Sequence, residues 1–177
     1  MSTAIPSWST EDSSRGEKLR GDESPGLGTK PQVPYVQGGM ELSGAVEFGR
    51  ANRKSVLTTI RSNGRPQLSN VMHHVFDDGV IRISITADRA KYRNLLREPW
   101  AALHVTRDDF FAYVVLEGDV ELSPVATRAD DATVDELVEY YRALQGEHQD
   151  WNAYRAAMVA DRRVVVRFRP TRAYGML

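Results

Sequence analysis

Apolar and polar residues alternate along several stretches of this chain, with the period of two that is typical of half-buried β-strands. The clearest stretch is VIRISIT, residues 80–86, in which three isoleucines alternate with polar side chains. Further strands are predicted for residues 55–60, 66–76, 100–106, 110–124 and 162–168. Asn-Gly and Asp-Gly pairs separate the first three strands and are typical of tight hairpin turns. We therefore expect these three strands to form an antiparallel meander.

A second pattern, with apolar residues three and four positions apart, predicts helices before and between the strands. These helices cover residues 41–51, 88–97, 133–144 and 150–159. In the third helix, Thr133 and Glu136 have the spacing of an N-terminal capping box. Hairpin-connected strands with inserted helices predict a mainly β (α+β) domain whose sheet closes, or nearly closes, into a barrel.

Residues 1–39 have a different composition from the rest of the chain. They are rich in Ser, Gly, Pro and charged residues and show no periodicity, so they bury too little apolar area to offset the entropy of ordering. We expect a disordered leader before one domain of residues 40–177. The alternative is an arm that uses Trp8 and Tyr35 as anchors to pack on the domain or on a partner subunit. Met40 is an alternative candidate for the start of the protein.

The overall composition excludes several classes of protein. The formal net charge is -1, whereas a dedicated nucleic-acid binder is usually strongly basic. There are no cysteines, so disulfides and thiolate catalysis are excluded. No apolar run reaches the ~20 residues of a membrane span, and the N-terminus lacks the apolar core of a signal peptide. We expect a cytoplasmic protein that binds neither nucleic acid nor a membrane.

The histidines do not predict a metal site. His73 and His74 are neighbours on a predicted strand, so their side chains point to opposite faces and cannot chelate one ion. We expect His74 to be a hydrogen-bonded residue of the barrel wall. Dinucleotide and P-loop motifs and a Ser-His-acid arrangement are also lacking. What remains is a binding module, or an enzyme whose cofactor supplies the chemistry.

The strongest functional signal is DRAKYRNL, residues 88–95, where Arg89, Lys91 and Arg93 fall within five positions. The first turn of a helix has free N–H groups and a dipole that favours anions over cations. Cations gathered there are explained if they hold an anion, of which phosphate is the usual one. Ser84 and Thr86 can add hydroxyl donors from the preceding strand. The alternative is a solvated basic helix.

The apolar residues of the last strand and of residues 112–118 lie on more than one face, which is more than a small barrel can bury alone. This pattern predicts a two-fold homodimer.

Several of these segments resemble a known family. VLTTIRSNGRPQLSNV, RAKYRNL, GEHQDWNAYRAAMVADRRVVV and the late AYG resemble the pyridoxamine 5′-phosphate oxidase-like split β-barrel superfamily. Within it they are most similar to the actinobacterial reductases that depend on the deazaflavin coenzyme F420. The resemblance implies an FMN-binding-protein-like split barrel and a homodimer with two cofactor sites at its interface. It also implies hydride transfer from reduced F420 to an unsaturated or conjugated small molecule.

The resemblance further implies which residues bind the cofactor. Arg89, Lys91 and Asn94, together with Ser84, would hold its phosphate and polar tail. The strand PQLSNV would run along the deazaflavin ring, with the candidate residues Gln67, Ser69, Asn70 and Val71. No protein acid or base is implied, and none is assigned. Two alternatives share the fold, namely an FMN-binding flavoprotein oxidase and a non-catalytic carrier of F420 or haem.

Overall fold

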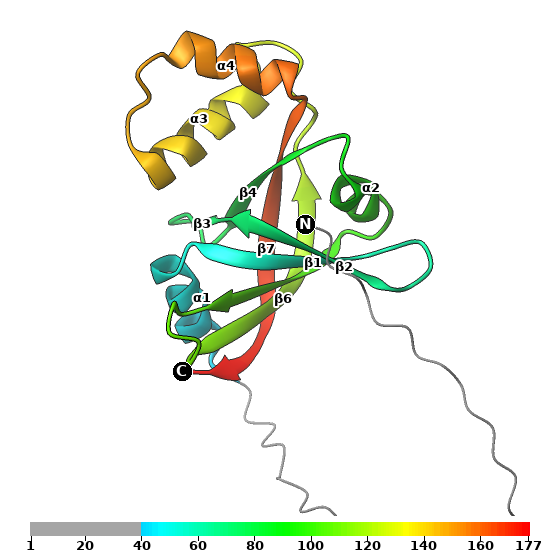
Figure 1. The fold of residues 1–177 in the computed structure, drawn as a ribbon, viewed down its shortest axis with the longest axis vertical. Coiled ribbons are helices and arrows are strands. Elements are labelled where there is room, and N and C mark those ends of the chain that lie inside the picture. The colour runs from blue at the N-terminus through cyan, green and yellow to red at the C-terminus, as the bar shows by residue number, and fades with distance from the viewer. Residues whose placement is uncertain (1–39) are drawn as a thin grey trace, which may run out of the picture. The chain divides into compact units, whose positions relative to one another are not determined.

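The structure is a computed structural model that describes residues 40–177, and the predictions for residues 1–39 concern residues outside this range. Its elements are, in chain order, α1 (Leu42–Ala51), β1 (Lys54–Ile60), β2 (Pro66–Met72), β3 (His74–Val75), β4 (Ile81–Thr86), α2 (Ala90–Arg97), β5 (Trp100–Thr106), β6 (Tyr113–Leu122), α3 (Ala132–Gln145), α4 (Trp151–Ala160) and β7 (Arg163–Met176) (Figure 1). The predicted mainly β fold with inserted helices is confirmed. None of the helices in this range is long and apolar enough to cross a membrane.

The strands form one antiparallel sheet in the order β2-β1-β5-β6-β7-β4-β3. Its two edge strands, β2 and β3, follow each other directly in the chain, so the sheet has to curl until its edges approach each other. The alternating apolar residues of the strands fill the interior of this curl. The largest fully buried side chains there include Leu57, Ile83, Leu103, Leu116 and Phe168. The result is a split β-barrel, as predicted.

The predicted three-strand meander is wrong in one respect. β2 pairs with β1 along its whole length, but β4 pairs with β7 and with the two-residue strand β3. The chain moves from one edge of the sheet to the other at His73. The backbone N–H of His73 donates to the Arg53 carbonyl (3.0 Å), whereas the next residue, His74, pairs with Arg82 on β4. Residues 66–76 are therefore two strands, one at each edge of the split.

β6 begins at Tyr113, not at Phe110 as predicted, because residues 107–112 form the turn that precedes it. The backbone N–H of Phe110 donates to the Arg107 carbonyl (3.0 Å), and the Arg107 N–H donates to the Ala112 carbonyl (2.9 Å). Phe110 has a positive φ of 66°, and its side chain is exposed. The apolar pair Phe110 and Phe111 continued the strand pattern in the sequence, but the chain turns there.

The predicted capping box of α3 is also wrong. Asp131 is the N-cap, and its carboxylate accepts from the backbone N–H of Val134 (2.8 Å). Thr133 instead donates to the Pro124 carbonyl (3.0 Å), and Glu136 forms ion pairs with two arginines of the sheet. The helix begins earlier than the capping-box pattern required, so both residues have other partners.

Replacing Asp131 with alanine should lower the free energy of unfolding by about 1–2 kcal/mol, because a helix N-cap is lost. The same carboxylate also accepts from the backbone N–H groups of Thr127 (2.8 Å) and Arg128 (3.1 Å), so the loop before α3 loses its anchor too. Urea denaturation measures the effect. The matched control is Asp130→Ala, which removes only an exposed ion pair with Arg128. Equal effects in the two variants would contradict the assignment of the cap.

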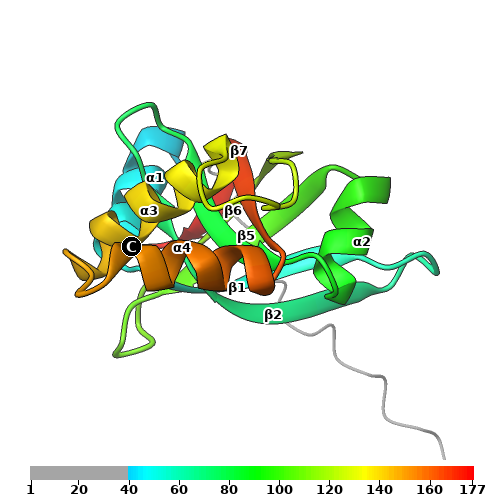
Figure 2. The same ribbon diagram turned by 90° about the horizontal axis from the view of Figure 1, so that it is seen from above.

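α3 and α4 pack together over one end of the sheet (Figures 1 and 2). Val134 and Leu137 of α3 and Met158 of α4 form a second small core against Val165 of β7. The second apolar face of the last strand, on which the homodimer prediction partly depended, is therefore covered by helices of the same chain.

Candidate functional site

A polar hollow lies where α2 begins. It has a volume of about 530 Å³, and we call it the cationic hollow. Its lining residues are Gln67, Ser69, Ser84, Ile85, Thr86, Arg89, Ala90, Lys91 and Arg163. Five of the eight residues predicted to bind a cofactor are in this set, from β2, β4 and the start of α2. β2 and β4 lie near opposite edges of the sheet, so the curl of the sheet brings these residues to one place.

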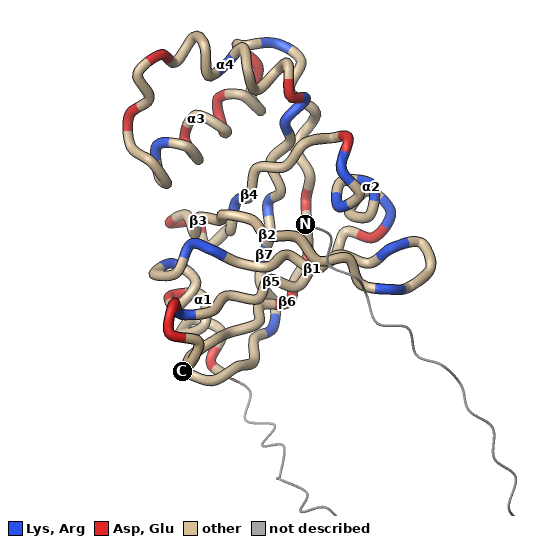
Figure 3. Tube along the Cα trace, in the orientation of Figure 1, with Lys and Arg blue, Asp and Glu red and all other residues tan. Residues whose placement is uncertain are grey.

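The start of α2 is open to a ligand. The helix begins at Ala90, two residues later than predicted, and its N-cap residue Arg89 makes no side-chain capping bond. Lys and Arg residues gather on this helix in Figure 3. Arg93 turns away, because its guanidinium donates to the Asp88 carbonyl (2.9 Å). Arg89 and Lys91 are the two cations of α2 that line the hollow.

Lys91 carries a charge without a partner. Within residues 40–177 its ammonium group makes no ion pair and no hydrogen bond. Burial, and then the positive charge of Arg89, lower the pKa of Lys91 below its ordinary value. A bound anion would raise the pKa of Lys91 again, because it brings negative charge next to Lys91 and Arg89. The unpaired ammonium group is therefore the feature of this hollow that most directly indicates an anionic ligand.

Arg163 is a third cation of the hollow, and the sequence did not predict it. It pairs with Thr86 in the β4–β7 ladder, and its guanidinium is 3.5 Å from the Ser84 hydroxyl. It also forms an ion pair with Asp161 (3.0 Å). RRVVVRF predicts the strand on which Arg163 lies, but its three consecutive valines do not show which face Arg163 occupies. The last strand, β7, pairs with β4, and this pairing brings Arg163 to the hollow. No local pattern in the sequence predicts that pairing.

Asn94 is not among the residues that line the hollow. It is 6% exposed, and its amide donates to the Thr59 hydroxyl (3.0 Å). That hydroxyl donates to Gln67 (3.1 Å), whose amide donates to the Ser69 hydroxyl (2.6 Å). Asn94 therefore begins a chain of hydrogen bonds that orients two lining residues, Gln67 and Ser69.

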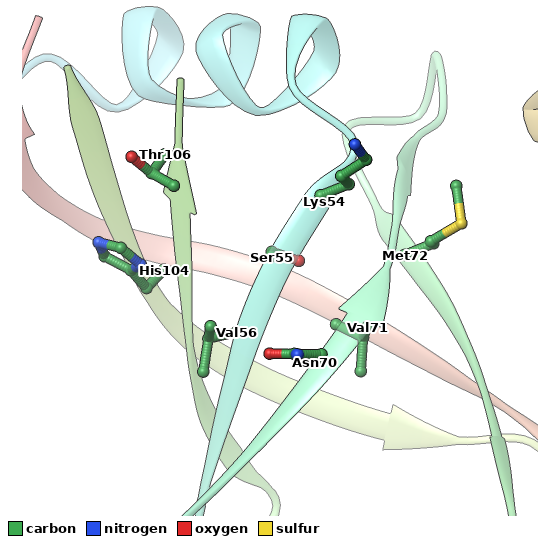
Figure 4. A pocket seen from close by; sticks show the side chains of 8 residues that line it. All are labelled: Lys54, Ser55, Val56, Asn70, Val71, Met72, His104 and Thr106. Atoms are coloured by element: carbon green, nitrogen blue, oxygen red, sulfur yellow. The ribbon is translucent and has the colours of Figure 1, made fainter. Parts of the chain in front are cut away.

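The other two predicted residues, Asn70 and Val71, line a second hollow of about 500 Å³, which we call the apolar hollow (Figure 4). It lies over β2, β1 and β5, where Val56 is paired with Asn70 on one side and His104 on the other. Its remaining lining residues are Lys54, Ser55, Met72 and Thr106. β2 is an edge strand, so residues of both its faces can reach a ligand.

A third hollow, of about 370 Å³, lies between β2 and the pair α3–α4, and we call it the tyrosine hollow. Tyr140, Tyr141 and Tyr154 line it together with Leu144, Gln145, Met158, Asn70, Val71, Met72, Ser84, Lys91 and Arg163. The Tyr140 hydroxyl donates to the Met72 carbonyl (2.8 Å) and the Tyr154 hydroxyl to the Leu137 carbonyl (3.0 Å). Burial raises the pKa of each to about 12, so both phenols stay neutral.

The adjacent histidines have opposite environments. His73 is fully buried, and its Nε2 is 3.0 Å from the Gly49 carbonyl, which can only accept. Nε2 therefore carries the proton, and Nδ1 accepts from the Ser55 hydroxyl (2.9 Å). The prediction that His74 is hydrogen-bonded is wrong, because its buried Nδ1 has no partner and its ring packs edge-on against Phe76. In the part of the chain that the structure describes, no three His, Asp or Glu residues are placed to hold a metal ion.

The described domain is a split β-barrel with a cationic hollow at the start of α2. The chain belongs to the pyridoxamine 5′-phosphate oxidase family, whose model matches residues 45–177. The predicted resemblance to this superfamily, close to F420 reductases, is confirmed.

Solved structures of the same fold carry different functions. An F420 reductase is 26% identical with a TM-score of 0.57, over 74% of this chain and 96% of that chain. A conserved hypothetical protein of Mycobacterium tuberculosis is 22% identical with a TM-score of 0.60, over 77% and 84% of the two chains. HutZ, the haem storage protein of Vibrio cholerae, is 15% identical with a TM-score of 0.57, over 77% and 96%. At 22% and 15% identity the last two show the fold alone.

Proposed function

We propose that this protein is an F420-dependent oxidoreductase that reduces an unsaturated or conjugated small molecule. The observation that carries the proposal is the unpaired Lys91 beside Arg89 at the uncapped start of α2, in a hollow lined with hydroxyl and amide groups. The 26% identity to an F420 reductase supports the choice of deazaflavin over other phosphate-bearing cofactors.

The residues of the cationic hollow fit the phosphate of such a cofactor. Lys91, Arg89 and Arg163 supply positive charge, and Ser84 supplies a hydroxyl donor. The Thr86 hydroxyl, which the sequence also suggested as a donor, donates instead to the Asp88 carboxylate. The ring would lie along β2 at Asn70 and Val71, where the apolar hollow begins. Reduced F420, when bound, would supply the hydride for one carbon of the acceptor's double bond, and a proton from the solvent would complete the reduction. The task of the protein is to bind and orient the two reactants on rigid strands.

We also propose that the protein is a homodimer that completes the apolar hollow from a second copy. Leu68 and Met72 of β2 are 61% and 41% exposed, and Met72 lines the apolar hollow. A second copy would remove this apolar surface from water. Light scattering at micromolar concentration should give twice the mass of the chain. The mass of a monomer would count against the proposal.

An FMN-binding flavoprotein is the second candidate, because the same contacts would hold the phosphate of FMN and the family takes its description from an oxidase. Bound FMN would give the purified protein a yellow colour and a flavin absorption band. We expect F420 to dissociate during purification, so the purified protein should be colourless.

Turnover separates an enzyme from a carrier of F420 or haem. The purified protein is mixed with reduced F420 and with a panel of enones, quinones and tetrapyrroles, and F420 oxidation is followed by absorbance. We expect the parent protein to reduce at least one acceptor faster than the Lys91→Ala variant does. Binding of F420 without turnover of any acceptor would contradict the enzyme and favour a carrier.

A further inference from the structure

We propose that Tyr140 is a positioning residue, whose hydroxyl holds the two walls of the cationic hollow at a fixed separation. It does so by bridging β2 and β4, which face each other across the split of the barrel. The inference rests on the proposed function for the ligand that these walls would hold, whereas the bridge itself belongs to the described fold. The site residues predicted from the sequence do not include Tyr140.

The cationic hollow has two walls that are not paired with each other as strands. β2 contributes Gln67 and Ser69, whereas β4, β7 and α2 contribute the residues of the other wall. β2 and β4 are not neighbours in the sheet. In the described range β3 pairs only with Ile81 and Arg82 of β4, so the edge of β4 at Ser84 faces the split. The separation of the walls therefore depends on contacts across the split as well as on the curl of the sheet.

The side chain of Tyr140 enters this split from α3. It is buried, and its hydroxyl donates to the Met72 carbonyl of β2 (2.8 Å). Burial raises the pKa of Tyr140 to about 12, and a hydrogen bond from the backbone N–H of Ser84, on β4, acts in the opposite direction. A phenol oxygen can donate one hydrogen bond and accept another. The Tyr140 hydroxyl thus acts as a donor toward β2 and as an acceptor toward β4.

α3 is tied to the sheet on either side of Tyr140, so the phenol is presented by a fixed helix. Glu136 lies one turn before Tyr140 on the same face of α3, and it forms ion pairs with two arginines, one on β4 and one on β7, at 2.7 Å each. At the other end of the helix, the guanidinium of Arg53, just before β1, donates to the Ala143 carbonyl (3.1 Å). Tyr140 lies between these two ties and so cannot follow a movement of one wall alone.

A fixed separation matters for a cofactor that contacts both walls. In the proposed placement the phosphate lies against Arg89 and Lys91, and the ring lies along β2 at Val71, next to the residue whose carbonyl Tyr140 binds. If the separation varies, binding one end of the cofactor no longer places the other end, and the affinity gained from preorganisation is lost. Inorganic phosphate contacts only the cationic wall. Tyr140 should therefore affect the affinity for F420 and not the affinity for phosphate.

The test compares Tyr140→Phe with the matched control Tyr154→Phe. Each substitution removes a phenol hydroxyl that donates to a backbone carbonyl, but the Tyr154 hydroxyl donates to Leu137 within the α3–α4 pair (3.0 Å). We expect Tyr140→Phe to weaken F420 binding about tenfold, the scale of one lost hydrogen bond, and to leave the binding of inorganic phosphate unchanged. Tyr154→Phe should leave both affinities unchanged. Fluorescence titration measures F420 binding, and calorimetry measures phosphate binding.

Hydrogen exchange of the full chain gives a readout that needs no ligand. The amides of β2, residues 66–72, should exchange about tenfold faster in Tyr140→Phe than in the parent protein, because β2 loses its tie across the split. They should exchange at the parent rate in Tyr154→Phe. Unchanged exchange of β2 in Tyr140→Phe, or an equal rise in both variants, would overturn the inference.

The ligand measurements separate this inference from the proposed function. F420 that binds equally well to the parent and to Tyr140→Phe would overturn the positioning role, as would an equal loss of phosphate and F420 affinity. F420 that binds to neither protein would overturn the proposed function, and the exchange of β2 would then still decide whether Tyr140 bridges the split.

Discussion

Replacing Lys91 with alanine should weaken F420 binding by about 1.5–3 kcal/mol, the scale of a charge-assisted hydrogen bond. This is roughly a ten- to hundredfold increase in the dissociation constant. Stability should change by less than about half a kcal/mol or rise slightly, because the ammonium group is unpaired near a helix N-terminus in the described structure. F420 fluorescence measures the affinity and thermal denaturation measures the stability.

The matched control is Arg128→Ala, which also removes one positive charge but lies before α3 and lines none of the hollows. It should leave F420 affinity unchanged. Added salt should weaken binding to the parent protein, and less steeply to the Lys91 variant, because screening acts on the charges that remain. Unchanged affinity in both Arg89→Ala and Lys91→Ala would contradict the placement of the phosphate.

The second large effect is expected at His73, where a substitution should lower the stability of the fold. His73→Leu should lower the free energy of unfolding by about 2–5 kcal/mol, because it leaves two buried polar groups without partners. These groups are the Gly49 carbonyl and the Ser55 hydroxyl. His73→Gln keeps an N–H donor near the position of Nε2 and should recover part of the loss. Urea denaturation at neutral pH measures both, and equal losses would contradict the role of the donor.

The same histidine should make stability depend on pH. Burial lowers the pKa of His73 to about 4 in the folded chain, against 6.5 when unfolded. The unfolded chain therefore binds the proton first, so the stabilisation is complete above pH 6.5 and is lost as the pH falls toward 4. Between pH 7 and pH 5 the loss is about 2 kcal/mol. His73→Gln should lack this component, and an identical pH profile in the variant would contradict it.

The sequence predicted most local elements, because their periods are local, but the last strand was predicted to end at residue 168 and continues to Met176. The alternating isoleucines at positions 81, 83 and 85 are buried as expected, and α1 and α4 lie within one residue of their predicted bounds. The pairing of β4 with β7 was not predictable in this way, since no local pattern states which distant strand is the neighbour. That pairing brings Arg163 to the cationic hollow, and so Arg163 was missed.

The predicted site residues were those with a local signal or a family motif. Arg89 and Lys91 stand out because cations are unfavourable at a helix start unless an anion is bound there. Asn94 belongs to the same motif, but its burial and its bond to Thr59 depend on how α2 packs against β1. The tyrosine hollow was not predicted, because it exists only where α3 and α4 meet β2.

A fluorescence titration of the purified protein with F420 and with FMN decides whether the cationic hollow serves a deazaflavin. We expect saturable binding of F420 that is tighter than that of FMN and is weakened in the Lys91→Ala variant. Binding of FMN in preference to F420, or no saturable binding of F420, would contradict the proposed function.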